Sequence, residues 1–337
     1  MEAQRAYRVR ERPLAPEDYD EPVGWWGWNW EPPVPMSVSQ LLAAGNLDAR
    51  TAALCWLVLE GHGSMLIASE PPHSGKTTTL TALLDMVPAS VRRVFLRGWA
   101  ETFDYVRQCD PRSTLLLANE LSSHLPVYLW GPKAVEVFRT LRKGFALAST
   151  LHADSAEEAV AQLTGELGVD PADLARVDLL LVMRVYRAGD RYGPIVRRVV
   201  SVDRLVPTVA GVAPVPLVTW DARRDAHAHD EAAELELLCR RAGPSGSVEA
   251  LTAELERRAE HLRALRDAGT FGIGEVREAL ARYQDGSSED PAMPLRASQL
   301  VSERSEAGPT GTGTPAPGHS RREARSDERE EERDPTA

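Results

Sequence analysis

The sequence predicts an α/β fold with a mostly parallel sheet, because short apolar runs alternate with helical segments through the middle of the chain. Four apolar runs have the length and composition of buried strands: 64–69, 91–96, 114–118 and 145–150. Helical spacing is clearest in segments between and after them: 76–86, 99–109, 132–142 and 156–167. A hairpin is then expected from 177–186 and 195–202, on either side of a glycine-containing turn.

The flanking regions differ from this α/β domain, expected at 37–228. Residues 1–36 are charged and then rich in tryptophan and proline, which predicts an N-terminal arm without its own core. Strand signals stop after position 221, and three helical segments predict a C-terminal helical domain over 229–285. The tail at 286–337 is predicted to be disordered, because its composition buries too little apolar surface to offset the entropy of ordering.

Composition excludes several classes of protein. A net charge of −11 over 337 residues argues against a protein whose main work is binding nucleic acid. Three scattered cysteines argue against zinc and against a disulfide framework. No apolar run is long enough to cross a bilayer, and the N-terminus lacks the apolar stretch of a signal peptide. We therefore expect a cytoplasmic protein without a transmembrane segment, either free or peripheral at the inner face of the cell membrane.

The segment SEPPHSGKTTTL at 69–80 follows the first predicted strand and opens a helix. It matches the phosphate-loop pattern G-x-x-x-x-G-K-[ST] at Gly75, Lys76 and Thr77, with Glu70 in place of the first glycine. Only three of the 39 basic residues are lysines, and one of them is Lys76. Because lysine is a compact charge that fits beside phosphates, its placement here favours a nucleotide site.

The loop chemistry predicts ATP and Mg²⁺ as ligands. Backbone N–H groups at a helix N-terminus bind phosphate, Lys76 would reach the β- and γ-phosphates, and the Thr77 hydroxyl would bind Mg²⁺. The expected nucleotide contacts are consecutive: Pro72, His73, Ser74, Gly75, Lys76, Thr77 and Thr78.

Two further polar residues follow predicted strands. Asn119 and Glu120 come directly after 114–118, at the strand end where α/β sheets bind their ligands. Glu120 is predicted to orient or deprotonate an attacking water and to reach Mg²⁺ through water, or else to be a surface glutamate. His152 follows 145–150 and precedes a helix capped by Asp154-Ser155, where it is either a functional group or a bystander in a capping turn.

In their order and spacing, GKTTTL at 75–80, NE at 119–120 and STLHADSAEEA at 149–159 resemble the secretion superfamily ATPases. These are the hexameric motors of type II and type IV secretion, type IV pilus assembly and the archaellum. The resemblance covers roughly 37–283, including a strand segment at 177–221. It implies a RecA-like P-loop core, with Lys76 and Thr77 in the nucleotide loop, Glu120 in the second acidic motif and His152 sensing the γ-phosphate. It also implies a homohexamer that works with a membrane platform protein.

The chain departs from that family at several positions. Glu70 and His73 replace loop glycines, Asn119 replaces the glycine before the glutamate, and Ser122-Ser123 replaces an Arg-Asp pair. Glu101 is the nearest stand-in for a further acidic motif of the family. The sequence therefore resembles a compact, divergent member.

Two alternative functions stay open beside this motor. One is a DNA-translocating RecA-like ATPase, and the other is a nucleotide-binding assembly protein with little hydrolysis. A strip of tryptophans between Trp25 and Trp30 either docks a partner or packs the arm onto its own domain. Arg139, Arg142 and Lys143 either reach the phosphates of a neighbouring subunit or form a solvated helix face.

Overall fold

The computed structural model describes residues 13–22, 35–71, 73–187, 189, 192–243 and 247–286. Three of the features discussed above lie outside these residues: the tryptophan strip, Pro72 and the tail from 287 onward. The N-terminal arm is described only in part. Within the described ranges, no helix is long and apolar enough to cross a membrane.

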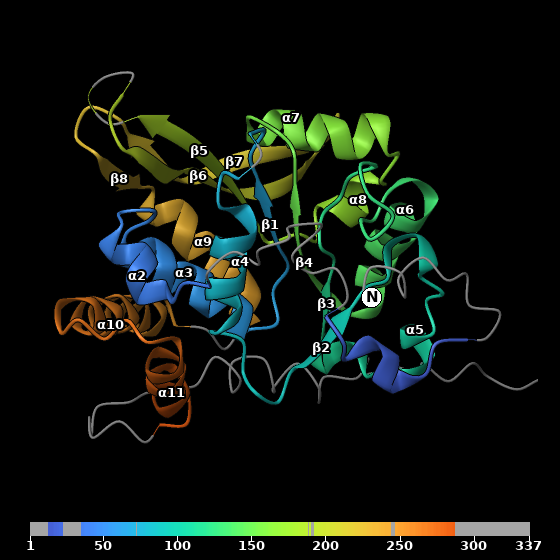
Figure 1. Cartoon of the computed structure of the whole chain (residues 1–337), viewed down its shortest axis with the longest axis horizontal. Coiled ribbons are helices and arrows are strands. Elements are labelled where there is room, and N and C mark those ends of the chain that lie inside the picture. The colour runs from blue at the N-terminus through green and yellow to red at the C-terminus, as the bar shows by residue number, and fades with distance from the viewer. Residues whose placement is uncertain are drawn as a thin grey trace, which may run out of the picture.

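One eight-stranded sheet, in the order β2-β3-β4-β1-β5-β6-β7-β8, forms the centre of the molecule (Figure 1). Five strands pair in parallel: β1 (Met65–Ala68), β2 (Arg92–Phe95), β3 (Thr114–Leu117), β4 (Ala146–Leu151) and β5 (Leu179–Arg187). Three more continue the sheet in antiparallel pairing: β6 (Ile195–Thr208), β7 (Gly211–Asp221) and β8 (Ala226–His229). The predicted class, an α/β fold with a mostly parallel sheet, is confirmed.

The order of the parallel strands fixes where a ligand site can form. From β1 the chain crosses to β2 and β3 on one side, and from β4 it crosses over β1 to β5 on the other. The loops that follow the neighbouring strands β1 and β4 therefore run in opposite directions. They leave a crevice at the carboxyl ends of these two strands. This is the topology of a RecA-like P-loop core, and both loops carry residues singled out from the sequence.

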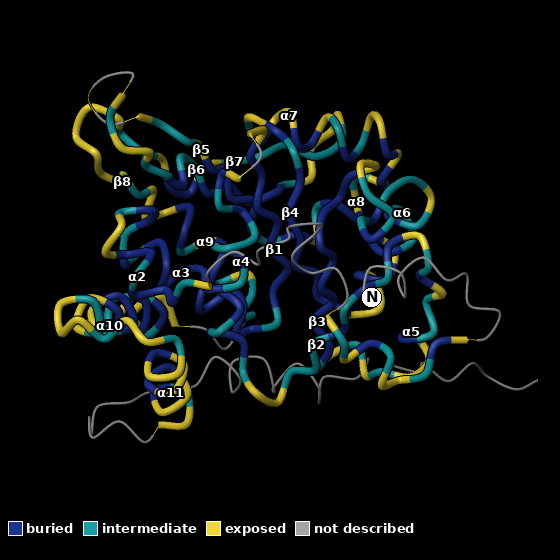
Figure 2. Tube along the Cα trace, in the orientation of Figure 1, coloured by how far each residue is buried: buried dark blue, intermediate teal, exposed yellow. Residues whose placement is uncertain are grey.

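Helices cover both faces of the sheet (Figure 1). The helices on one face are α2 (Val38–Ala43), α3 (Ala49–Glu60), α4 (Lys76–Leu84), α9 (Glu231–Ala242) and α10 (Val248–Asp267). On the other face lie α5 (Tyr105–Gln108), α6 (Gly131–Thr140), α7 (Ala156–Ala161) and α8 (Pro171–Leu174). Side chains of β1 alternate between the layers, Met65 and Ile67 toward α3 and α4, Leu66 and Ala68 toward the opposite helices. The strands are consequently buried on both faces (Figure 2).

Local signals place the first helices as expected. The Ser37 hydroxyl accepts a hydrogen bond from the Gln40 N–H, and the Gln40 side chain binds the Ser37 N–H in return, which caps α2. Gly45 takes a left-handed φ of 70° between α2 and α3. Asp48 then caps α3 by accepting a hydrogen bond from the Thr51 N–H.

The helix predicted over 99–109 is reduced to two short pieces, η2 (Gly98–Ala100) and α5. The carboxylate of Glu101 accepts hydrogen bonds from the N–H groups of Thr102 and Phe103. A side chain that binds nearby backbone in this way competes with helix formation. Phe103 accordingly takes a left-handed φ of 61°.

The end of the strand region was predicted wrongly. Strand signals were expected to stop after position 221, but β8 adds a short third strand to the antiparallel part. The residue pattern also set no bounds for β7, which contains Pro214 and Pro216. Because β8 pairs only with Val218–Asp221, these prolines lie where β7 is an edge strand, a position in which proline is tolerated.

The predicted C-terminal helices form α9, α10 and α11 (Ile273–Gln284). Leu251, Leu255 and Leu262 of α10 belong to the same buried apolar cluster as Trp56 of α3. The contacts thus continue the core on the α3 side of the sheet, while the division into two domains at position 229 stays a prediction.

Candidate functional site

The loop between β1 and α4 contains two left-handed residues. Gly75 has φ 94° and forms the N-cap of α4, and His73 has φ 58°. The Arg197 guanidinium of β6 donates hydrogen bonds to the His73 carbonyl at 3.1 and 3.2 Å. This clamp holds the left-handed His73, a conformation that costs energy in a residue other than glycine.

Lys76 begins α4 and is buried. Its Nζ donates a hydrogen bond to the Ser69 carbonyl at 2.9 Å, which joins the two ends of the loop. Burial lowers the pKa of Lys76, and the carboxylates of Glu120 and Glu70 oppose that shift. The Ser74 hydroxyl is also buried, and the described residues give it no hydrogen-bond partner. Thr77 and Thr78 are half-buried in the first turn of α4.

Glu120 follows β3 and is only 8% exposed. Its backbone is fixed on two sides, because the Leu129 N–H donates to the Glu120 carbonyl at 2.9 Å and the Leu121 N–H donates to Thr150 in β4 at 2.7 Å. This pairing continues the sheet beyond β3 and brings the Glu120 carboxylate to the end of β4.

His152 connects the loop after β1 with Glu120. Its Nδ1 lies 2.8 Å from the Glu70 carbonyl oxygen, which can only accept, so Nδ1 is the donor. Its Nε2 lies 3.1 Å from Oε1 of Glu120. The contact with Glu120 raises the pKa of His152, while burial and Lys76 oppose the rise. Three predicted site residues, Lys76, Glu120 and His152, therefore meet at the β1–β4 crevice.

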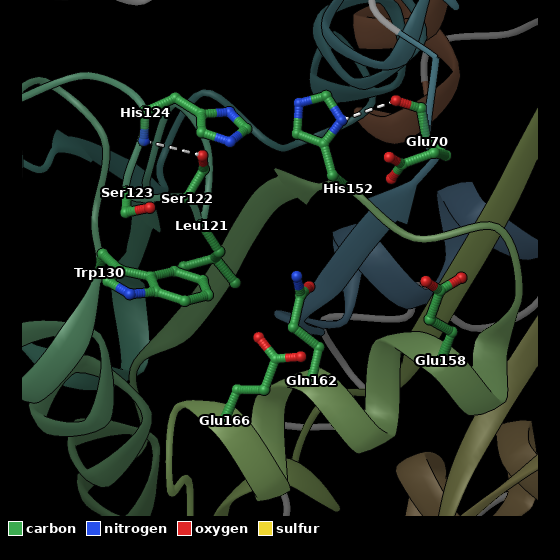
Figure 3. A pocket seen from close by; sticks show the side chains of 10 residues that line it. All are labelled: Glu70, Leu121, Ser122, Ser123, His124, Trp130, His152, Glu158, Gln162 and Glu166. Carbon is green, nitrogen blue, oxygen red and sulfur yellow. Dashed lines mark hydrogen bonds between the residues drawn. The ribbon is translucent and has the colours of Figure 1, made fainter.

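A pocket of about 600 Å³ opens beside His152 (Figure 3). One wall comes from the segment after Glu120 and the start of α6: Leu121, Ser122, Ser123, His124 and Trp130. The other wall comes from α7 and the π-helical turn that follows it, η5 (Gln162–Glu166): Glu158, Gln162 and Glu166. Glu70 and His152 lie where this pocket meets the loop, and Lys76 and Thr77 do not line it.

Sequence reasoning missed His124. Its ring centre lies 5.5 Å from that of His152, and ligand atoms of Glu120, His124 and His152 all lie within 4.8 Å of one another. The sequence signal that could have found it is the spacing of His124 four residues after Glu120. In that segment the sequence indicated only that Ser122-Ser123 replaces an Arg-Asp pair of the family.

The other sequence candidates lie elsewhere. Glu101 is buried and accepts hydrogen bonds from the Tyr19 hydroxyl at 2.7 Å and the Arg97 N–H at 3.0 Å, so it joins its own turn to the N-terminal segment. Arg142 forms ion pairs with Asp170 and Asp173. These partners tie Arg142 to the segment before β5, which favours a structural role over a phosphate contact.

No protein-family model matches the chain. A curated relative, the uncharacterized protein MJ0900 of Methanocaldococcus jannaschii, is 27% identical over 287 residues. The match covers 78% of this chain and 51% of that protein, so the chain spans about half the length of the relative.

Three solved structures are similar in part, and they are ATPases or motors, two of them of a type IV secretion system and of pilus retraction. The VirB11 ATPase of the Brucella suis type IV secretion system is 18% identical, with a TM-score of 0.34 over 59% of this chain and 62% of that one. The Legionella pneumophila ATPase DotB is 15% identical, with a TM-score of 0.31 over 67% and 58%. The pilus retraction motor PilT with bound ADP is 12% identical, with a TM-score of 0.30 over 73% and 66%. Superpositions this loose transfer no residue roles to this chain.

Proposed function

We propose that this chain is a Mg²⁺-dependent ATPase whose nucleotide site lies at the β1–β4 crevice. The observation that carries the proposal is the convergence of Lys76, Glu120 and His152, which follow three different strands and meet at one point. Ligands of α/β proteins bind at such a point, beyond the carboxyl ends of strands that diverge in their connections.

The loop has the chemistry of an anion site. The nine-residue helix α4 presents its N-terminus there, and Lys76 supplies a buried positive charge. The buried Lys76 ammonium donates a hydrogen bond to the Ser69 carbonyl, an uncharged acceptor, so it gains from an anionic partner. The Ser74 hydroxyl provides a further donor. These features fit the phosphates of ATP.

Glu70, the residue in place of the first loop glycine, is compatible with this proposal. Its backbone φ is not in the left-handed region, where the described non-glycine residues are His62, His73, Phe103 and Asp225. Its side chain is exposed and lines the neighbouring pocket (Figure 3). The turn therefore does not need glycine at position 70.

For hydrolysis, Glu120 would orient a water and accept its proton, because it is a buried carboxylate at the end of β3. Lys76 would neutralise negative charge that develops on the phosphate. Mg²⁺, bound through the Thr77 hydroxyl and near Glu120, would add to that neutralisation. His152 binds the Glu70 carbonyl and contacts Glu120, so a change in either position would reach the other. This supports a role in sensing the γ-phosphate.

The biological setting is proposed from the sequence resemblance. We infer a motor for secretion or type IV pilus-like filament assembly that acts as a homohexamer with a membrane platform protein, at the cytoplasmic face of the membrane. The alternatives are a DNA translocase, against which the net charge of −11 argues, and a nucleotide-binding assembly protein with little turnover.

Binding and turnover, measured separately, test the proposal. Titration with a fluorescent ATP analogue reports binding, and release of inorganic phosphate reports turnover. We expect Lys76→Ala to weaken binding about tenfold or more, because it removes the buried charge. Glu120→Gln should still bind but lose turnover by about 10²-fold or more. Glu278→Gln is the matched control, since Glu278 is exposed on α11.

Other outcomes select among the alternatives. If the wild type binds ATP but turns over no faster than Glu120→Gln, the chain is a nucleotide-binding assembly protein. Turnover that rises on adding duplex DNA would favour the translocase. If the wild type binds no nucleotide, the proposed site is wrong.

A further inference from the structure

We propose that Glu120, His124 and His152 form a site for one divalent transition-metal ion of the zinc type, at the end of the pocket where the segments after β3 and β4 meet. The ion site goes beyond the proposed ATPase, because it does not require ATP to bind, although it shares Glu120 and His152. The scattered cysteines of the chain have no part in this site, because its ligands are two imidazoles and a carboxylate.

The geometry of the three side chains is close to what such an ion needs. Zinc binds histidine nitrogen at about 2.0–2.1 Å and carboxylate oxygen at about 2.0–2.2 Å, so ligand atoms of a tetrahedral site lie roughly 3.4 Å apart. Glu120 and His152 already approach to 3.1 Å, and all three ligand atoms lie within 4.8 Å of one another. The His124 ring is exposed and points toward the side of the pocket that carries His152 (Figure 3). A rotation of its side chain would close the remaining gap.

The hydrogen bonding of His152 fits a cation between its ring and Glu120. Because Nδ1 donates to the Glu70 carbonyl, the neutral ring presents an unprotonated Nε2 toward Glu120. Two acceptors, Nε2 and the carboxylate oxygen, then face each other at 3.1 Å. Either a proton or a metal ion must lie between them.

The position of Glu120 favours the metal ion. Its Oε1 is buried and no described donor meets hydrogen-bond geometry with it, despite the short distance to His152. The carboxylate oxygen therefore lies off the direction in which Nε2 would donate a proton. A metal ion also lies off the line that joins two of its ligands, so it would satisfy both atoms.

The surroundings hold the ligands as in known metal sites. A ligating histidine usually donates its second ring N–H to a carbonyl or carboxylate, and His152 does this with Glu70. In His124 it is the backbone N–H that donates a hydrogen bond, to the Ser122 hydroxyl at 3.2 Å (Figure 3). This bond fixes the segment that carries the His124 ring. Three protein ligands leave a coordination position open toward the pocket.

The ligand set selects the kind of ion. Imidazole suits zinc, iron, copper and nickel, whereas Mg²⁺ and Ca²⁺ prefer oxygen ligands alone. The glutamates of the pocket wall, Glu158 and Glu166, add negative charge that attracts a cation.

A bound ion would also affect the proposed hydrolysis. It would hold the Glu120 carboxylate and Nε2 of His152, so neither could act on a water or respond to phosphate. Zinc should therefore inhibit ATP turnover, and inhibition should require His124.

Metal binding is tested on the full chain, stripped with chelator and without nucleotide. Co²⁺ is titrated and followed by its visible absorption, and Zn²⁺ is titrated by calorimetry. We expect one ion per chain at low micromolar affinity or tighter, with the Co²⁺ absorption of a site of low coordination number. His124→Ala and Glu120→Gln should each weaken binding by about tenfold or more. His227→Asn, a change in β8 at a histidine whose ring binds the Val199 carbonyl oxygen, is the matched control and should bind as the wild type does. Circular dichroism checks that every variant is folded.

The proposal is overturned if Co²⁺ and Zn²⁺ bind only at millimolar concentration, or if His124→Ala binds as tightly as the wild type. ATP binding to the metal-free protein is measured separately, so failure of the ATPase proposal does not resemble failure of the metal site.

In the turnover assay, each variant is compared with its own rate in the absence of zinc. Inhibition at stoichiometric zinc in the wild type, with about tenfold more zinc needed for His124→Ala, supports the competition. Tight zinc binding without inhibition would contradict it.

Discussion

At the scale of single residues, the loop between β1 and α4 has glycine at position 75, where its backbone needs one, and not at position 70, where its backbone does not. Gly75 has φ 94°, and a Cβ there would lie 3.1 Å from Cδ of Arg197. Position 70 has no such constraint, while the loop's other left-handed residue, His73, is held by the same arginine. Arg197 of β6 thus acts on both left-handed positions.

Gly75→Ala should therefore damage both stability and binding. A left-handed φ in an L-residue costs about 1–2 kcal/mol, and Arg197 must also move and loosen its hold on His73. Urea unfolding should show that loss, and the fluorescent ATP analogue should bind more weakly. Gly165→Ala is the control, because a Cβ at Gly165 meets nothing within 4 Å and its φ is not left-handed. Equal stability of the two variants would show that Gly75 is unconstrained.

Residues of the site differ in how far the sequence could predict them. Glu120 and His152 come shortly after apolar strands, and Lys76 begins the helix after the loop from β1, so a parallel sheet brings them together once the strands are recognised. His124 and Arg197 could not be predicted in this way. His124 depends on the path of the segment after Glu120, and Arg197 depends on the pairing of β6 at a distance of over one hundred positions along the chain.

At the scale of elements, β8 shows why a short strand escaped prediction. Its sequence, Ala-His-Ala-His, has little strand propensity, and its position is fixed by tertiary contacts. His229 Nε2 lies 2.8 Å from Asp48, the N-cap of α3, and its Nδ1 lies 2.7 Å from the fully buried Glu234 of α9. Arg50 of α3 also binds Glu234, at 2.8 Å. The charges therefore join β8, α3 and α9.

This junction predicts a pH-dependent stability. Asp48 and Glu234 raise the pKa of His229 to about 9 against the effect of burial, and His229 lowers the pKa of Asp48 to about 2. The protonated His229 thus stabilises the fold fully below its unfolded pKa of about 6.5, and this contribution is lost as the pH rises through 9. We expect the free energy of unfolding to fall by roughly 1–3 kcal/mol between these values.

Urea unfolding at several pH values across that range measures the decrease in the free energy of unfolding. The variants His229→Asn and His227→Asn are measured in parallel with the wild type. His229→Asn cannot carry the charge, so its stability should be lower at neutral pH and nearly flat over the range. His227→Asn should keep the slope of the wild type, because the His227 ring contacts only a backbone oxygen, that of Val199, in its hydrogen bonding. Identical slopes in both variants would place the titrating group elsewhere.

At the scale of the whole molecule, the sequence predicted the parallel core well because each strand there is a short apolar run between turns. The antiparallel part was harder, since β7 and β8 carry prolines and histidines whose tolerance depends on neighbouring strands. The packing of the C-terminal helices on the core was the hardest feature to predict, because it depends on contacts between segments that are far apart in the sequence. One buried charge, Arg258, tests that relation.

Arg258 lies at the junction of three helices and is 2% exposed. It forms ion pairs with Glu60 of α3 at 2.6 Å and with Glu254 of α10 at 2.7 Å. Its guanidinium also lies 4.6 Å from the ring centre of Trp56 and 5.6 Å from that of Tyr283. Arg258 therefore couples α10 and α11 to α3, which packs directly on the sheet.

Arg258→Ala should lower the stability of the whole molecule by about 3–5 kcal/mol, because it leaves the buried Glu60 without its cation and removes one of the two cations, Arg257 and Arg258, that pair with the buried Glu254. Arg282→Ala is the control, since the exposed Arg282 pairs with the exposed Glu278 at 3.6 Å, and an exposed pair of this kind contributes less than about 1 kcal/mol.

Unfolding is followed by tryptophan fluorescence and by far-ultraviolet circular dichroism, with ATP-analogue binding at each urea concentration. If the helices and the core form one cooperative unit, all three signals shift together to lower urea. If 229–285 is a separate domain, circular dichroism should show an early loss of helix while nucleotide binding persists. The same experiment thus decides whether the C-terminal helices unfold together with the β1–β4 crevice, to which α3 connects them.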